Sequence, residues 1–133
     1  MAEVVREGYE GAEILGIHFE GPYLDMEYKG AQPPEAIAVP SVEQFQMYQK
    51  AANGLIRYIT LAPEHDPEFA LTRYCKETGV VVSMGHSSAT YEQAMMGIAN
   101  GATSMTHVFN GMTPFHHRKP GLVGTALRVR DIY

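Results

Sequence analysis

The strongest constraint on the fold is an order repeated along the chain, in which a short β-rich run precedes a segment with helical periodicity. Strand character is predicted for residues 12–19, 56–61, 80–82 and 102–108. Strands that alternate with helices usually pair in parallel, because the helix carries the chain back to the end of the sheet from which it started. The sequence therefore predicts an α/β fold with four consecutive strands of one sheet.

Capping residues mark where the intervening helices begin. Ser41, with Gln44 three residues later, predicts a capping box at the first helix. Asp66, with a proline directly after it, predicts the start of the second helix, and Thr90 predicts the start of the third. A further short helix is predicted at residues 122–128.

The chain is too short for a complete eightfold barrel. It has 133 residues, whereas a (β/α)8 barrel needs about 250. We therefore predict a partial (β/α)8 TIM barrel of about four consecutive βα units, with residues 1–133 as a single domain. The strand predicted so soon after Met1 suggests a piece cut from a longer protein. Self-association is expected, because such a piece leaves two sheet edges and one sheet face uncovered.

Composition and charge limit the possible partners. The net charge is -5, and no run of Lys or Arg follows a groove, which argues against nucleic acid and anionic membrane surfaces. No apolar stretch approaches the roughly 20 residues of a membrane span, so a cytoplasmic protein is expected. The single cysteine, Cys75, lies in a helical pattern and is expected to be buried, with a reactive thiol as the lesser alternative.

Four chemically competent side chains fall where predicted strands end, namely those of His18, Glu20, His86 and His107. Barrel enzymes build their sites at the carboxyl ends of parallel strands. A lone histidine is more often structural, but a carboxylate and two imidazoles at equivalent positions favour a catalytic divalent ion. We predict Glu20, His86 and His107 as ligands. His18 lies deeper on the same face and is predicted to form hydrogen bonds beneath the ion.

Two loops beside this site have both a functional and a structural interpretation. Residues 85–90, rich in glycine and serine, resemble a phosphate-binding nest, although helix capping explains the same residues at least as well. Residues 106–121 carry amides, imidazoles and a guanidinium, a set suited to a sugar phosphate. Arg118 offers bidentate geometry for phosphate, and its alternative is a solvated loop charge.

The strings GIHFEGPYL, ITLAPE, GHSSATYEQA and THVFNGMTPFHHRKPGLVGTAL resemble successive signatures of the N-acetylglucosamine-6-phosphate deacetylase family, within the amidohydrolase superfamily. The resemblance runs from about Gly16 to Leu127. It implies family strands 3 to 6 of the barrel and hydrolysis of the acetamide of N-acetylglucosamine 6-phosphate. It also implies the same three metal ligands, Glu20, His86 and His107.

The resemblance further implies how substrate is held. Asn110 and Gly111 would contact the sugar phosphate, and Arg118 would reach the phosphate from a neighbouring subunit, which makes the parent enzyme a homodimer. Gln32 stands where relatives usually carry a histidine and lacks its positive charge. The aspartate expected to act as the catalytic base lies outside these residues, so the chain alone is expected to be inactive.

Two other interpretations remain open. The chain can derive from a different amidohydrolase that acts on a cyclic amide or an amino-purine, or it can be a non-catalytic assembly module whose histidines are structural. The cofactor is expected to be a divalent metal ion. His and carboxylate ligands suit Zn, Fe, Co and Mn alike, so the sequence does not choose among them.

Overall fold

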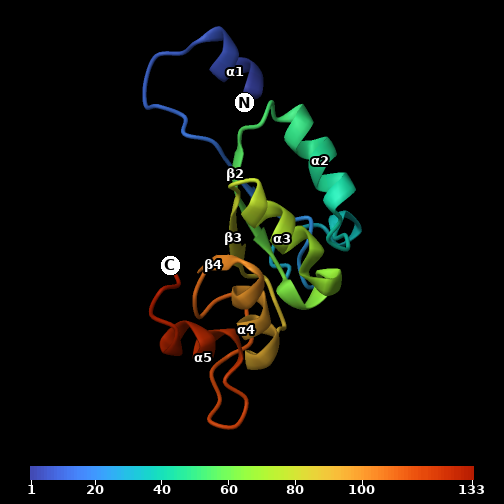
Figure 1. Ribbon diagram of the computed structural model, residues 1–133, viewed down its shortest axis with the longest axis vertical. Coiled ribbons are helices and arrows are strands. Elements are labelled where there is room, and N and C mark those ends of the chain that lie inside the picture. The colour runs from blue at the N-terminus through green and yellow to red at the C-terminus, as the bar shows by residue number, and fades with distance from the viewer.

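The computed structural model describes residues 1–133 and has one parallel sheet of four strands in the order in which they occur along the chain (Figure 1). The strands are β1 Ile17–Glu20, β2 Ile56–Leu61, β3 Val81–Met84 and β4 Ala102–Met105. The helices are α1 Ala2–Glu7, α2 Val42–Ala51, α3 Ala70–Glu77, α4 Tyr91–Asn100 and α5 Gly121–Arg128. The predicted α/β fold with four consecutive βα units, a part of a TIM barrel, is confirmed.

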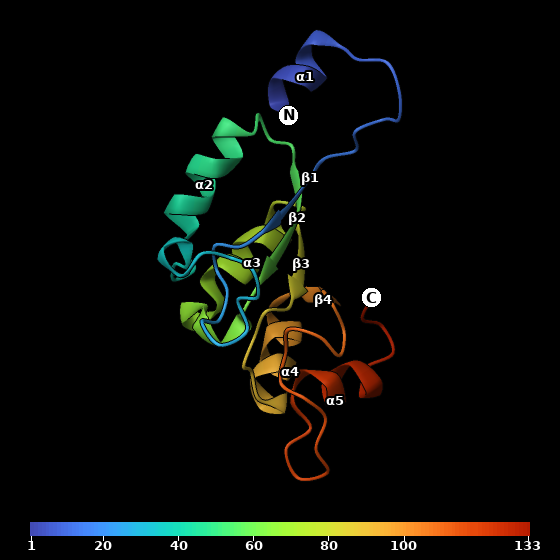
Figure 2. The same ribbon diagram turned by 180° about the vertical axis from the view of Figure 1, so that it is seen from behind.

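Helices α2, α3 and α4 lie along one face of the sheet, which Figure 2 shows from behind. The core between them is apolar, as expected for the covered face of a parallel sheet. Its buried members include Phe45, Ile59, Leu61, Leu71, Val82, Met84 and Ala94. Gly97 lets α4 approach β3 closely, because a Cβ there would lie 2.8 Å from Met84 Sδ. None of the helices is long and apolar enough to cross a bilayer.

The other face of the sheet lacks a layer of helices like α2 to α4 and is only partly exposed to solvent, since Thr60 and Ser83 on it are fully buried. Val81 is 40% exposed on the same face. The edge of β4 is not fully open, because the amide of Met105 donates to the Tyr133 carbonyl (2.6 Å) and the amide of Tyr133 donates to the Thr103 carbonyl (3.0 Å). The terminal residue thus covers part of one predicted edge.

The three predicted helix starts are capped in three different ways. The Ser41 hydroxyl accepts from the Gln44 amide at 3.2 Å, which makes half of the predicted capping box. Thr90 and Gln93 form a complete one. At Asp66 a 3-10 turn, Pro67–Phe69, intervenes before α3, so the carboxylate caps from a distance by accepting from the amides of Leu71 and Thr72.

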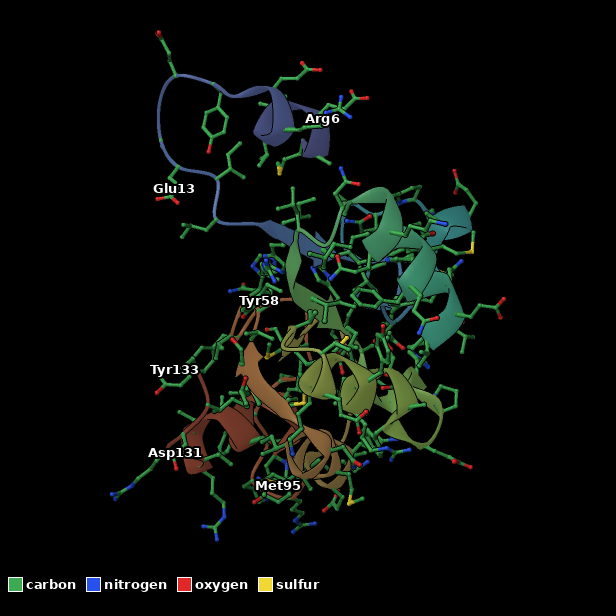
Figure 3. The ribbon with its side chains drawn as sticks, turned by 45° about the horizontal axis from the view of Figure 1, so that its top comes forward. Arg6, Glu13, Tyr58, Met95, Asp131 and Tyr133 are labelled. Atoms are coloured by element: carbon green, nitrogen blue, oxygen red, sulfur yellow. The ribbon has the colours of Figure 1, made fainter.

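The amino-terminal segment departs most from the sequence-based expectation. Residues 2–7 form α1, which was not predicted, and β1 begins at Ile17 instead of residue 12. Figure 3 shows Arg6 and Glu13 on this segment, away from the sheet. No residue of α1 is buried.

Candidate metal centre

Glu20, His86 and His107 meet at the carboxyl end of the sheet. Glu20 is the last residue of β1, and each histidine comes two residues after its strand, β3 or β4. Parallel strands place these positions on one edge. The Glu20 Oε1 atom lies 2.7 Å from His86 Nε2 and 2.9 Å from His107 Nε2. The three ligand atoms all lie within 4.8 Å of one another, which is close enough to hold one ion.

Both histidines occupy an unusual backbone conformation. The φ angle is 48° at His86 and 58° at His107, in the left-handed region that non-glycine residues rarely adopt. Such conformations cost about 1–3 kcal/mol each and persist where surrounding contacts impose them. The turn at each strand end therefore directs an imidazole back over the sheet toward Glu20, at the expense of local strain.

The tautomer of His86 follows from its partners. Its Nδ1 lies 2.6 Å from the Tyr28 carbonyl, which can only accept, so Nδ1 carries the proton. In the neutral ring Nε2 then has a lone pair, and that lone pair faces the Glu20 carboxylate. The contact needs a positive centre, either a second proton on the ring or a metal ion that takes the lone pair. A backbone partner on the far nitrogen is the usual setting of a metal-binding histidine.

The Glu20 carboxylate is ionised in this setting. Burial raises the pKa of Glu20, but the hydrogen bonds with His86 and His107 outweigh burial and hold the pKa below its usual range. The two rings pack edge to face with centroids 5.3 Å apart. A carboxylate and two imidazoles with no bulky neighbour between them are a donor set that suits a divalent ion.

His18 does not join the three ligands. Its Nε2 lies 2.7 Å from the Thr60 hydroxyl, and its ring packs edge-on against Tyr58. The Thr60 hydroxyl in turn contacts Thr106, which contacts Ser83, each at 2.7 Å. Desolvation lowers the pKa of His18, which favours the neutral ring. His18 is thus hydrogen-bonded to a layer of hydroxyls on the sheet that carries the three ligands, and its role beneath an ion stays a prediction.

The predicted substrate-binding residues are divided between two regions. Gly111 lies against the His86 ring, since a Cβ there would be 3.5 Å from Nδ1. Asn110 lies in a tight turn, in which its amide donates to the His107 carbonyl. Gln32 lines a shallow pocket that also includes Glu20. These residues adjoin the three ligands.

Arg118 is not brought to the three ligands. It is exposed on the loop between β4 and α5, which projects from the body in Figures 1 and 2. It lines a separate pocket of about 770 Å³ between this loop and the start of α4, and none of the three ligand residues reaches that pocket.

A second polar cluster was missed by the sequence analysis. Asp25, Glu64 and His65 also bring their ligand atoms within 4.8 Å of one another. Their carboxylates are already occupied, because Ser88 donates to both Asp25 and Glu64, and Ser87 donates to Glu64. The cluster therefore joins three loops. Its sequence signals are that Glu64 comes three residues after a predicted strand and that Glu64, Ser87 and Ser88 lie in the strings ITLAPE and GHSSATYEQA.

No family model matches the chain. Among curated proteins, the N-acetylglucosamine-6-phosphate deacetylase of Bacillus subtilis (strain 168) is 49% identical over 117 residues, which is 88% of this chain and 30% of that protein. The N-acetylgalactosamine-6-phosphate deacetylase of Escherichia coli O157:H7 is 36% identical over 127 residues, 96% of this chain and 34% of that protein. The chain thus spans about a third of the length of these relatives.

Solved structures give the same result for the backbone. A mutant N-acetyl-D-glucosamine-6-phosphate deacetylase from Mycobacterium smegmatis, in complex with N-acetyl-D-glucosamine-6-phosphate, superposes with a TM-score of 0.89 at 36% identity. The match covers 98% of this chain and 33% of that one. The four parallel strands therefore correspond to part of the fold of that enzyme.

Proposed function

The chain matches part of the N-acetylglucosamine-6-phosphate deacetylase family in sequence and in fold, and on this premise we propose that its parent protein hydrolyses the acetamide of N-acetylglucosamine 6-phosphate. The products are glucosamine 6-phosphate and acetate. The observation that carries the proposal is the convergence of Glu20, His86 and His107 from three strands on one point.

The three side chains would hold a divalent ion and leave one position free for water or substrate. An ion bound there would lower the pKa of a bound water and would polarise the amide carbonyl. Glu20 supplies the negative charge, since its pKa is already held below the usual range. The Tyr28 carbonyl keeps the proton of His86 on Nδ1 and leaves Nε2 as the donor atom.

Substrate binding is assigned to the loops around these ligands. Asn110 and Gly111 adjoin His86 and His107 and would contact the sugar phosphate. Gln32, beside Glu20, offers hydrogen bonds without a positive charge. Arg118 lies on the projecting loop and would bind the phosphate held by a neighbouring subunit, which is why we propose a homodimer for the parent.

An aspartate outside this chain would take a proton from the water and give it to the leaving amine. The chain alone is therefore expected to be inactive or nearly so. It is still expected to bind a divalent ion weakly.

The test is His107→Ala in the full-length protein. The variant is expected to lose stoichiometric metal and turnover, because one of three ligands is removed. His117→Ala, a loop histidine outside the ligand set, is the control for metal content. Wild-type protein without stoichiometric metal would support an assembly module with structural histidines, and an unchanged metal content in His107→Ala would refute the ligand assignment.

The substrate is tested separately, because one relative acts on the galactosamine epimer. The full-length protein should be assayed with N-acetylglucosamine 6-phosphate, N-acetylgalactosamine 6-phosphate, a cyclic amide and an amino-purine. We expect the highest kcat/KM with N-acetylglucosamine 6-phosphate. Turnover confined to the cyclic amide or the amino-purine would overturn the proposal.

A further inference from the structure

Asp25 is linked to His86 in two ways, one direct and one through the loop that Asp25 begins. Its amide donates to the His86 carbonyl at 2.8 Å. Its Oδ1 accepts from the amides of Glu27 and Tyr28 at 2.9 and 3.3 Å. The second pair of bonds folds the loop so that the next carbonyl, that of Tyr28, lies 2.6 Å from His86 Nδ1. The main chain of Asp25 therefore contacts the backbone of His86, and its side chain shapes the loop that meets the His86 ring.

We propose that Asp25 is a positioning residue for His86, which holds the Tyr28 carbonyl against Nδ1, so that Nδ1 keeps a proton and Nε2 is directed toward Glu20. The inference rests on the proposed metal site. It assigns to Asp25 no contact with substrate or ion.

The other oxygen of Asp25 is bound elsewhere. Its Oδ2 accepts from His65 at 2.8 Å and from the Ser88 hydroxyl at 3.0 Å. Glu64, which accepts from the amide and hydroxyl of Ser88, completes the cluster. Since Asp25 is only 8% exposed, these bonds are shielded from water and hold the carboxylate in one place. Oδ2 therefore anchors the side chain to the loops after β2 and β3, and Oδ1 shapes its own loop.

The consequence for the ring is a choice of tautomer. A neutral imidazole carries one proton, and an acceptor at Nδ1 keeps it there. Without a fixed Tyr28 carbonyl the proton is free to occupy Nε2, where it blocks the atom assigned to the ion. Partners of this kind in other metal sites change metal affinity by roughly 10- to 100-fold when they are removed.

The experiment uses the whole chain without metal, with histidine ¹⁵N labels and long-range ¹H–¹⁵N spectra at neutral pH. Signals of His86 are assigned by their absence from the His86→Gln spectrum. The wild type is expected to show His86 protonated at Nδ1, and a ring protonated at Nε2 alone would overturn the inference without any variant. Asp25→Ala is expected to shift the ring toward the Nε2 tautomer. Asp25→Asn, which keeps an oxygen for the two amides, is expected to retain the wild-type tautomer.

Asp66→Ala is the matched control. Asp66 is equally buried, at 4% exposure, and its carboxylate accepts from Leu71 and Thr72, away from the candidate ligands. It should lower stability without moving the His86 tautomer. The same tautomer shift in Asp66→Ala as in Asp25→Ala would mean that Asp25 affects His86 only through the general stability of the fold, and would overturn the inference.

Zn²⁺ titration by calorimetry separates this inference from the proposed function. Asp25→Ala is expected to bind Zn²⁺ roughly 10- to 100-fold more weakly than wild type. A wild type that binds no Zn²⁺, together with the tautomer shift in Asp25→Ala, would end the proposed metal site and support the positioning role. Equal Zn²⁺ affinity and equal tautomers in both proteins would overturn the positioning role alone.

Discussion

The Nε2 atom of His18 lies 2.7 Å from the Thr60 hydroxyl, and this contact begins a chain of hydrogen bonds that runs across the sheet. Thr60 contacts Thr106, and Thr106 contacts Ser83. The four residues lie on or directly after β1, β2, β4 and β3 respectively. The hydroxyl layer therefore links all the strands that carry the candidate ligands, one step below them.

Thr106→Val is expected to destabilise the chain by roughly 1–3 kcal/mol, because valine keeps the shape and leaves Thr60 and Ser83 without their shared partner. Urea denaturation measures the difference in free energy of unfolding. Thr125→Val is the control, since the Thr125 hydroxyl is fully buried but bonds only to its own helix at Gly121. An equal loss in both variants would mean that the layer adds nothing beyond an ordinary hydroxyl.

Tyr23→Phe is expected to leave stability unchanged or to raise it by up to about 1 kcal/mol. Tyr23 is fully buried, its hydroxyl has no hydrogen-bond partner, and desolvation raises its pKa. Removing that hydroxyl therefore removes a desolvation penalty and no bond. Tyr58→Phe is the contrast, because the Tyr58 hydroxyl contacts Ser104. A clear loss of stability in Tyr23→Phe, measured by thermal unfolding, would contradict the absence of a partner.

Cys75 is expected to resist alkylation in the folded chain. Burial, with a smaller contribution from the Asp66 charge, raises the pKa of its thiol to about 12, so the reactive thiolate is scarce at neutral pH. Iodoacetamide at pH 8 should label the native chain far more slowly than the chain in urea. Similar rates in the two conditions would show that α3 opens readily.

Asp25→Asn is expected to show a pH-dependent loss of stability. Burial raises the pKa of Asp25, but hydrogen bonds from His65, Ser88 and two amides outweigh it, so the folded pKa lies below the unfolded one. The ionised carboxylate thus stabilises the fold above the unfolded pKa, near 3.9, and this stabilisation is lost as pH falls through the folded pKa. The gap in unfolding free energy between wild type and variant should be constant near neutrality and shrink below about pH 4. A gap that grows on acidification would reverse the sign.

The order of strands was predictable because each strand is a short apolar run with a turn signal after it. Ile56–Leu61 was predicted with its actual bounds, and α5 was predicted within one residue. The run at residues 12–19 was misassigned at its start, because its first five residues have no strand partner and pairing with β2 begins at Ile17.

The missed details depend on contacts that spacing does not reveal. Phe69 adopts a left-handed conformation before α3, although neither glycine nor asparagine stands there. Asp66 reaches past this turn to the helix amides.

The sequence predicted which side chains of the candidate site meet, but not which groups support them. The convergence of Glu20, His86 and His107 follows from their places at the ends of parallel strands, and the structure brings them together. Their binding of a metal ion stays a prediction. The support from Tyr28 was not accessible, because a backbone carbonyl leaves no mark on residue type. Asp25, its organiser, looks in the sequence like any loop acid.

Strand β1 has a neighbour on one side only, β2, yet it carries the single carboxylate of the candidate centre. The two histidines lie 66 and 87 positions after Glu20 in the chain. An ion held by all three side chains would therefore cross-link distant segments of the chain. Detaching one outer strand would release the ion without unfolding the rest of the sheet. Loss of the ion on mild warming would then report the detachment of an outer strand, either β1 with Glu20 or β4 with His107.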